Sequence, residues 1–230
     1  EKGSQLYENT KKAFQILLDT EEHLKRSQNT GYLRIAASNV LCKHFLMPYL
    51  KEFTGHYPNT DLSITCTSSM TACSMVEQGR IDLALVAKPE NPGTAVYHSL
   101  GVIEYIFVCT PAYRNKLNCG NDQIFEQGNI MLLDQDNVSR RHLDNYYAQN
   151  KITPLHILEV NEMDLLIEFA KMGIGVSCVV KQFVEQELQE GALIEIALSK
   201  PIAPREIGFL YHRMQPMNEN ILKFIEGKTQ

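Results

Sequence analysis

The feature that most constrains the fold is a regular alternation of strand and helix patterns in the first half of the chain. Strand patterns cover residues 32–38, 62–66 and 81–87, and helical patterns cover residues 41–56 and 68–78. The third strand, IDLALVA, is nearly all apolar, which is typical of a strand covered on both faces. Strands that alternate with helices in this way pair in parallel through right-handed crossovers. We therefore predict an α/β fold, with a kink or a second helix start at Pro48.

Two proline-rich segments separate a second α/β set from the first. Residues 88–93 hold two prolines and a glycine, and Pro201 and Pro204 form a second cluster, so both segments are predicted to be crossings between domains. Between them, strands are predicted at residues 102–109, 130–133, 155–160, 176–180 and 193–197, and helices at residues 139–150, 162–172 and 183–189. A strand at residues 206–211 and a helix at residues 217–226 return to the first set.

This order predicts two Rossmann-like lobes joined by two crossover segments. We assign residues 31–88 together with 204–230 to the first lobe and residues 89–203 to the second. Two lobes joined in this way form a hinged clamp, and open α/β sheets bind ligands beyond the carboxyl ends of their strands. The sequence therefore predicts a cleft between the lobes that holds a small molecule.

A long helix is predicted ahead of the lobes, in residues 1–30. Residues 4–27 contain no glycine or proline, and apolar or small residues recur at alternating steps of four and three from Leu6 to Leu24. That repeat is a coiled-coil-like seam, and because it is short it needs either the body of the chain or a partner helix. We favour a partner helix, so this segment is predicted to be a linker that joins two copies of the chain.

Composition excludes several classes of function. The net charge is −5, whereas a chain that holds DNA through its phosphates needs a basic face. No stretch approaches the roughly 20 apolar residues that span a bilayer, and no secretory signal opens the chain. The six cysteines show no CxxC pairing and are predicted to be buried, reduced thiols of a cytoplasmic protein. The chain also begins at Glu1, so we expect it to be part of a longer protein.

Patterns typical of catalytic and cofactor sites are missing from the sequence. It contains no GxSxG, GxGxxG, GxxxxGK[ST] or HExxH motif. The seven histidines are dispersed, and His156 and Glu159 fall on opposite faces of one predicted strand, so we predict no metal site. We also predict no cofactor and no catalytic residue.

Polar side chains recur where a predicted strand gives way to a helix. Ser, Thr and Asn at such positions ordinarily cap the following helix. Clusters at equivalent strand ends would also bring hydroxyls and backbone N–H groups together, at helix ends that suit anions. Arg140 would either add a bidentate contact to a carboxylate or be a solvated side chain. The sequence therefore predicts a small, polar, anionic ligand held by Ser38, Asn39, Thr67, Ser68, Ser69, Asn137, Ser139, Arg140, Asn161 and Glu162.

Five stretches of the chain are weak signals alone but specific in their order and spacing. They are GYLRIAAS (31–38), LMPYLKEFTGHYPNTDLSI (46–64), VEQGRIDLALV (76–86), LLIEFAKMGIGVSCV (165–179) and VEQELQEGALIEI (184–196). The segment PREIGFLYHR (204–213) and the last predicted helix continue the series. Together these stretches resemble the effector-binding part of bacterial LysR-type transcriptional regulators, and the resemblance covers essentially the whole chain.

The resemblance implies a periplasmic-binding-protein-like fold of type 2 and a cytoplasmic regulator that binds promoter DNA as a homodimer or tetramer. The family's winged helix-turn-helix domain would precede this chain, and residues 4–27 would belong to the linker helix that pairs two subunits. A small-molecule effector in the cleft would change the geometry of the DNA-binding domains, with no membrane partner. The family's effector contacts match Ser38, Asn39, Ser68, Ser69, Asn137, Ser139 and residues Asn161 to Met163, which adds Met163 to the predicted site.

Two other classes of function fit a two-lobed α/β chain. A solute-binding protein of an uptake system shares the architecture, but it predicts an exported chain with few free thiols and no leading amphipathic helix. An enzyme would place an acid–base pair or a nucleophile in the cleft, and the sequence offers none. We therefore predict the regulator and keep the solute-binding protein as the alternative.

Overall fold

The structure is a computed structural model that describes residues 31–212 and 218–227, together with Lys2, Gly3, Leu6, Tyr7, residues 9–11 and Phe14. The described residues before residue 31 are helical. Most of the predicted linker helix lies outside the described residues, so its pairing role stays a prediction. Among the described helices, none combines the length and the apolar character needed to cross a bilayer.

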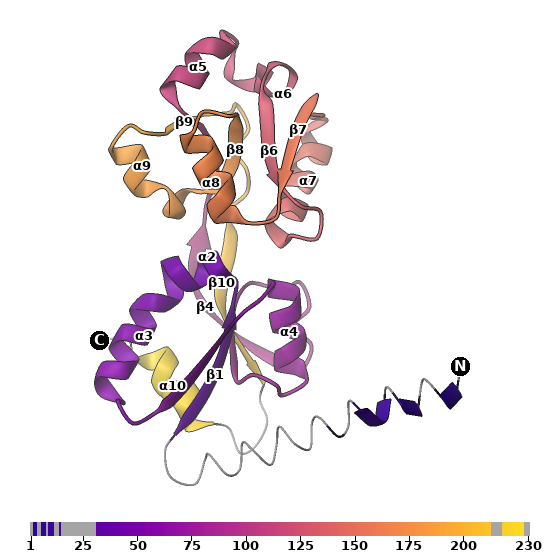
Figure 1. The fold of residues 1–230 in the computed structure, drawn as a ribbon, viewed down its shortest axis with the longest axis vertical. Helices are drawn as coiled ribbons and strands as arrows, with labels where there is room; N and C mark the ends of the chain where they lie inside the picture. Colours follow the sequence, from indigo (N-terminus) through magenta and orange to yellow (C-terminus); the bar gives the residue numbers. More distant parts are fainter. Residues whose placement is uncertain are drawn as a thin grey trace. The chain divides into compact units, whose positions relative to one another are not determined.

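The chain forms two compact units, and each is built on its own five-stranded sheet (Figure 1). Unit 1 comprises residues 1–99 and 208–230, and unit 2 comprises residues 100–207. Helices pack against both sheets. The predicted α/β fold with two lobes is therefore confirmed.

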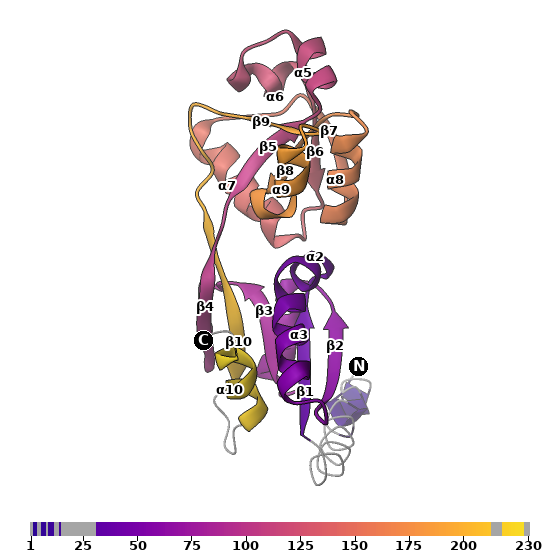
Figure 2. The same cartoon turned by 90° about the vertical axis from the view of Figure 1, so that its left-hand side faces the viewer.

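In unit 1, strands and helices alternate, and the sheet has the order β2-β1-β3-β10-β4 (Figure 2). Its elements are β1 (Tyr32–Ala37), α2 (Asn39–Leu41), η1 (Cys42–Leu46), α3 (Met47–His56), β2 (Asp61–Cys66), α4 (Ser69–Glu77), β3 (Leu83–Ala87), β4 (Ala95–Ile103), β10 (Arg205–His212) and α10 (Glu219–Glu226). β1 pairs in parallel with both β2 and β3, as the crossover pattern predicts.

The first helical segment changes its winding twice. Asn39 begins α2, residues 42–46 form the π-helical turn η1, and α3 starts at Met47. Pro48 lies in the first turn of α3, where its missing N–H is tolerated. In a continuous α-helix the carbonyl of residue 44 would lack a donor, because proline at position 48 has no N–H. A change of winding just before Pro48 is therefore physically reasonable. The chain stays helical from Asn39 to His56, so the predicted kink or second start corresponds to a change of winding within one helical run.

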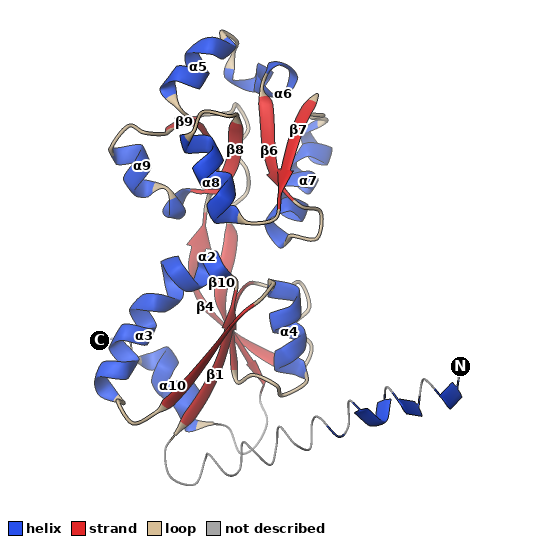
Figure 3. Cartoon of the chain, in the orientation of Figure 1, coloured by secondary structure: helices blue, strands red, loops and turns tan. Residues whose placement is uncertain are grey.

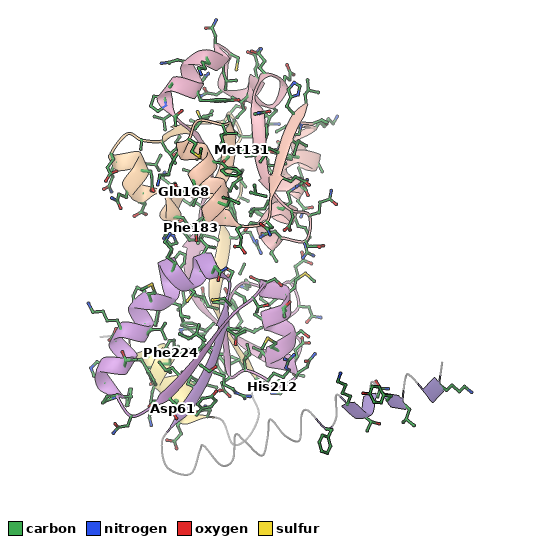
Figure 4. The ribbon with its side chains drawn as sticks, viewed as in Figure 1. Asp61, Met131, Glu168, Phe183, His212 and Phe224 are labelled. Atoms are coloured by element: carbon green, nitrogen blue, oxygen red, sulfur yellow. The ribbon has the colours of Figure 1, made fainter. Side chains whose placement is uncertain are left out.

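Helices cover both faces of the unit 1 sheet (Figure 1). On one face, α4 packs against small buried residues of the strands in a cluster that includes Ala36, Ala72, Val76, Ala84 and Val86. On the other face, α3 and α10 bring aromatic rings together. The ring of Phe224, labelled in Figure 4, lies with its centroid 5.2 Å from that of Phe53 and 5.7 Å from that of Phe209. β3 is therefore covered from both sides, as its apolar sequence predicts.

An ion pair with little exposure joins β1 to the residue just before β3. The Asp82 carboxylate accepts hydrogen bonds from Arg34 Nη2 (3.0 Å), Arg34 Nε (3.2 Å) and the Arg34 backbone N–H (2.8 Å). The Asp82 N–H in turn donates to the Arg34 carbonyl at 2.9 Å. Arg34 Nη2 also donates to the Gly79 carbonyl at 3.0 Å. The Arg34–Asp82 pair therefore holds the turn between α4 and β3 against β1.

The unit 2 sheet is mixed and has the order β7-β6-β8-β5-β9. Its strands β6, β7 and β8 are drawn in red in Figure 3. Its elements are β5 (Tyr105–Cys109), α5 (Pro111–Leu117), η2 (Asn121–Gln123), α6 (Ile124–Gln127), β6 (Asn129–Leu133), α7 (Val138–Asn150), β7 (His156–Val160), α8 (Met163–Lys171), β8 (Val176–Val180), η3 (Lys181–Phe183), α9 (Glu185–Gln189) and β9 (Ile194–Ile196). β6 pairs in parallel with β7 and β8, whereas β5 runs antiparallel to β8 and β9. Met131 of β6, labelled in Figure 4, is fully buried in the core of this unit.

The boundaries of the units differ from those predicted for the lobes. The prediction divides the chain at residues 88/89 and 203/204, whereas the units divide at 99/100 and 207/208. The first proline cluster forms a turn, in which the Ala95 N–H donates to the Pro92 carbonyl at 3.0 Å, and it leads directly into β4. β4 carries mostly half-buried and exposed side chains, so its sequence gives no clear apolar pattern. The chain therefore passes between the units within β4 and β10, and the predicted single strand at 102–109 is two strands interrupted at Glu104.

Tyr147 carries a buried hydroxyl with no hydrogen-bond partner among the described residues. Its ring lies among Phe107, Phe125 and Tyr146, and burial raises the pKa of its hydroxyl. A buried polar group without a partner costs about 1–3 kcal/mol. Tyr147→Phe keeps the ring and removes that group, so we expect the free energy of unfolding in urea to rise by about 1 kcal/mol.

Tyr146→Phe is the matched control for this prediction. The Tyr146 hydroxyl donates to the Lys200 carbonyl at 2.8 Å, so its removal should lower the free energy of unfolding. A Tyr147→Phe variant that is less stable than the parent would contradict the prediction.

Candidate ligand site

In unit 1 the predicted polar residues lie at one edge of the sheet. β1 and β2 run in parallel with Ala37 opposite Cys66, so both strands end at the same level. The Thr67 N–H donates to the Ala37 carbonyl at 3.0 Å, which carries the pairing one residue further. The structure therefore brings to this edge the residues that follow the two strands, which are Ser38, Asn39, Thr67, Ser68 and Ser69.

Two serines at this edge cap helices. Ser38 Oγ accepts from the Leu41 N–H at 3.4 Å, and Ser68 Oγ accepts from the Thr71 N–H at 3.2 Å. Ser68 Oγ also shares a 2.9 Å hydrogen bond with Thr71 Oγ1. The helices α2 and α4 thus begin at this edge, and their first-turn N–H groups give it a partial positive charge. Capping and ligand binding are compatible roles here.

Unit 2 repeats this arrangement at the ends of β6 and β7. The two strands are parallel, with Leu133 opposite Val160. After β6, Asn137 Oδ1 accepts from the Ser139 N–H at 2.8 Å and caps α7. The predicted Asn137 and Ser139 therefore lie together at the start of a 13-residue helix.

The predicted residues after β7 differ in their exposure. Asn161 and Glu162 are exposed and immediately precede α8. Glu162 is the N-cap residue of α8, but its side chain makes no capping hydrogen bond. Met163 is only 5 % exposed, so its side chain packs in the core of unit 2.

Arg140 is buried and engaged by groups of its own unit. Its Nη1 donates to Glu159 Oε1 at 2.6 Å and to the Leu133 carbonyl at 2.7 Å, and its Nε donates to Asp144 Oδ1 at 2.9 Å. Burial works against the positive charge, but the bonds to the two carboxylates outweigh it and raise the pKa of Arg140. The bidentate contact predicted for a ligand carboxylate is thus replaced by contacts to Asp144 and Glu159. Arg140 ties α7 to β6 and β7 and supports the edge.

Three residues that the sequence does not single out converge on Ser139. The hydroxyl of Tyr105, the first residue of β5, lies 2.9 Å from Ser139 Oγ. Arg205, the first residue of β10, donates from Nη1 to the Val138 carbonyl at 3.2 Å, and its charge lies near enough to Tyr105 to oppose the rise that burial causes in the pKa of that hydroxyl. The centroid of the His142 ring lies 5.1 Å from that of the Tyr105 ring. We call Tyr105, Ser139, His142 and Arg205 the unit 2 cluster.

The unit 2 cluster combines hydrogen-bond donors with one fixed positive charge. Burial lowers the pKa of His142, and its Nε2–H donates to the Ala203 carbonyl at 2.7 Å, so the imidazole is neutral at pH 7. Burial raises the pKa of Tyr105, so its hydroxyl keeps its proton, and Arg205 supplies the charge. A guanidinium, two hydroxyls and the N-terminus of α7 together suit a carboxylate, sulfate or phosphate group.

Little in the sequence reveals this cluster. Its members come from β5, α7 and β10, which are far apart in the chain. Arg205 follows a proline that marks only a break, and Tyr105 stands in an apolar run. His142 alone carries a signal, because it lies three residues after Ser139 and so shares its face of the helix. In the part of the chain that the structure describes, no three His, Cys, Asp or Glu side chains are placed to hold a metal ion.

Sequence comparisons relate the chain to HTH-type transcriptional regulators. A family model described as the LysR substrate binding domain matches residues 26–227. The uncharacterized HTH-type transcriptional regulator YeiE of Escherichia coli K12 is 20 % identical over 207 residues, which are 89 % of this chain and 70 % of that protein. The HTH-type transcriptional regulator IlvY of the same strain is 25 % identical over 162 residues, which are 68 % of this chain and 54 % of that protein.

A solved structure shows the same fold. The regulatory domain of CcmR from Synechocystis PCC6803, in complex with 2-PG, matches with a TM-score of 0.73 at 16 % identity. The match covers 87 % of this chain and 98 % of that one. The predicted two-lobed, periplasmic-binding-protein-like architecture is confirmed.

Proposed function

The chain belongs to the LysR substrate-binding domain family, and we propose that this ligand-sensing regulatory domain recognises a small anion on the unit 2 cluster. The observation that supports an anion is the convergence of the Arg205 guanidinium with the hydroxyls of Tyr105 and Ser139 at the start of α7. Membership of the family favours a sensing domain over the solute-binding protein of an uptake system.

The polar residues at the two strand edges are proposed to supply the other contacts. In unit 1 these are Ser38, Asn39, Thr67, Ser68 and Ser69, and in unit 2 they are Asn137, Asn161 and Glu162. Their place beside helix starts supports that role, because first-turn N–H groups and hydroxyls both donate to anions. Arg140 and Met163 are proposed to support the edge without touching the ligand, since one is held by carboxylates and the other is buried.

The whole regulator is proposed to be longer than this chain. The curated relatives are HTH-type regulators, and the chain matches 70 % and 54 % of the length of the two described above. A DNA-binding domain outside this chain would bind promoter DNA in the cytoplasm, and residues 4–27 would join two or four copies. The anion would favour one state of the regulator through its differential affinity, with a coupling of about 1–3 kcal/mol. We propose binding and release only, with no catalytic step, so the anion would leave unchanged.

Arg205→Gln tests the anion site. A hydrogen bond to a charged group contributes about 1.5–3 kcal/mol, so we expect the variant to bind anions about 10–150-fold more weakly. The measurement is isothermal titration of the parent and the variant with sulfate, phosphate and pyruvate. A parent that binds none of these anions would contradict the proposal.

Arg141→Gln is the matched control. Arg141 is exposed on the first turn of α7, and its Nη2 lies 3.3 Å from the Asp136 carbonyl oxygen, so it brings the same charge to the same helix outside the cluster. We expect its affinity to stay within about twofold of the parent. Equal losses in the two variants would mean that general charge, and not the unit 2 cluster, attracts the anion.

A further inference from the structure

The cysteines of unit 1 are placed differently from the buried thiols that the sequence predicts. All six cysteines are free, and Cys109 and Cys178 are buried as predicted. Cys66, the last residue of β2, is exposed, so the prediction is wrong for this residue. Cys42, the first residue of the π-helical turn η1, is half-buried.

The topology of unit 1 brings Cys42 and Cys66 together although they are far apart in sequence. Cys66 lies opposite Ala37 in the parallel pair of β1 and β2. Ser38 follows Ala37, and its carbonyl accepts the Cys42 N–H at 2.8 Å, so Cys42 stands one helical turn above the end of β1. The two thiols are close enough for Cys66 to raise the pKa of Cys42, beside the larger effect of burial.

We propose that Cys42 and Cys66 form a dithiol modification site that a hydroperoxide converts to an intramolecular disulfide. Two thiols that neighbouring backbone segments bring together can form an S–S bond with little backbone movement. π-helical turns are rare and concentrate at functional sites, and η1 places Cys42 here. This inference does not depend on the anion site, because it concerns other residues and another reactant.

Exposure assigns the two thiols different roles. Cys66 meets the solvent and is the thiol that an oxidant reaches first. Burial raises the pKa of Cys42, and the neighbouring Cys66 raises it further, so Cys42 is a poor first nucleophile. Cys42 is therefore the resolving thiol.

The reaction balances with the hydroperoxide as the only oxidant. The Cys66 thiolate attacks the terminal oxygen of ROOH, so an S–O bond forms, the O–O bond breaks, and the alcohol ROH leaves after taking a proton. Cys42 sulfur then attacks the sulfenic acid of Cys66, so an S–S bond forms, the S–O bond breaks, and hydroxide leaves as water with the Cys42 proton. Two thiols lose two electrons in total, and the hydroperoxide gains them.

The disulfide would join the turn after Ser38 to the strand end before Thr67. Both residues belong to the unit 1 edge, so oxidation would fix the backbone on which the proposed ligand contacts stand. The site thus links the redox state of unit 1 to the geometry of that edge.

Peptide mapping of the oxidised chain tests the proposal. The 230-residue protein is treated with a small excess of hydrogen peroxide, alkylated under denaturing conditions, digested without reductant and analysed by mass spectrometry. We expect two of the six thiols to be lost, with one peptide pair joined through Cys42 and Cys66, and reversal by dithiothreitol. Oxidation of Cys66 while Cys42 stays alkylatable, or a Cys66–Cys66 link between chains, would overturn the proposal.

Single-cysteine variants separate the two roles. In Cys42→Ser, Cys66 should accumulate as a sulfenic acid that reacts with dimedone, whereas in Cys66→Ser, Cys42 should stay unmodified. Cys73→Ser is the matched control, because Cys73 is also half-buried in unit 1 but lies on α4, and the Cys42–Cys66 link should form as in the parent. A link that forms equally well between Cys73 and either thiol would reject the assignment of this pair.

Discussion

Asp82→Ala is expected to lower the free energy of unfolding by about 3–5 kcal/mol, which is the cost of breaking a buried ion pair from one side. The Asp82 side chain is 9 % exposed and that of Arg34 is 16 % exposed. Water can therefore replace few of the hydrogen bonds that the Asp82 carboxylate accepts from Arg34. The substitution leaves the guanidinium of Arg34 and its backbone N–H without the acceptor that now serves both. The loss should therefore greatly exceed that of a surface ion pair.

The measurement is urea denaturation followed by circular dichroism, because the chain contains no tryptophan. Asp61→Ala is the control, since Asp61 is an exposed aspartate at the start of β2, and it should change stability by no more than about 0.5 kcal/mol. Hydrogen exchange should show lost protection in β1 and β3 before any change in unit 2. A loss below about 1 kcal/mol for Asp82→Ala would mean that the pair does not hold the turn in place.

A double-variant cycle shows whether the effect belongs to the pair. In Arg34→Met/Asp82→Ala no charge is left buried, so the double variant should be more stable than the sum of the two single losses predicts. The expected coupling is about 0.5–3 kcal/mol. Additive losses would assign the cost to the two side chains separately.

Local patterns predicted most of the helices and strands because burial acts on short runs of sequence. The nearly apolar IDLALVA run became β3, whose side chains lie between α4 on one face and α3 with α10 on the other. β4 escaped prediction because it has few fully buried side chains and gains its place from the neighbouring β10. β4 and β10 lie about 110 residues apart in the sequence, and a local pattern does not show that they pair. The unit boundaries, which fall within these two strands, were therefore not predicted.

In the candidate site, too, local features were predicted and contacts between distant segments were not. Ser38, Ser68 and Asn137 were predicted to cap helices, and each does, because capping depends only on the next three residues. The contact of Arg140 with Glu159 was not predicted because Glu159 comes from β7, which a pattern within α7 does not reveal. Tyr105 and Arg205 were missed for the same reason, since each reaches Ser139 or its neighbour from another strand. The sequence thus predicts the helix caps of the candidate site better than the contacts of its charged side chains.

The close approach of β8 to β6 depends on Gly175, the second glycine of the segment GIG. Gly173 has a positive φ of 71°, which suits the turn after α8. Gly175 has a different reason to be glycine. A Cβ there would overlap the carbonyl oxygen of Asn129 and would lie 3.1 Å from Met131 Cγ, so the space is taken by the backbone and side chains of β6. A backbone oxygen in a paired strand has no room to move aside.

Gly175→Ala is therefore expected to destabilise the chain near the upper end of the roughly 1–3 kcal/mol that overpacking costs. β8 lies between β6 and β5, so a shift of its first residues disturbs the parallel pair on one side and the antiparallel pair on the other. Gly55→Ala is the matched control with the opposite sign. Gly55 lies in the last turn of α3 with nothing within 4 Å of an added Cβ, so alanine there should stabilise by about 0.5–1 kcal/mol. The free energy of unfolding of both variants is measured by urea denaturation. Changes of the same sign in the two variants would show that helix propensity and steric overlap do not govern these two positions.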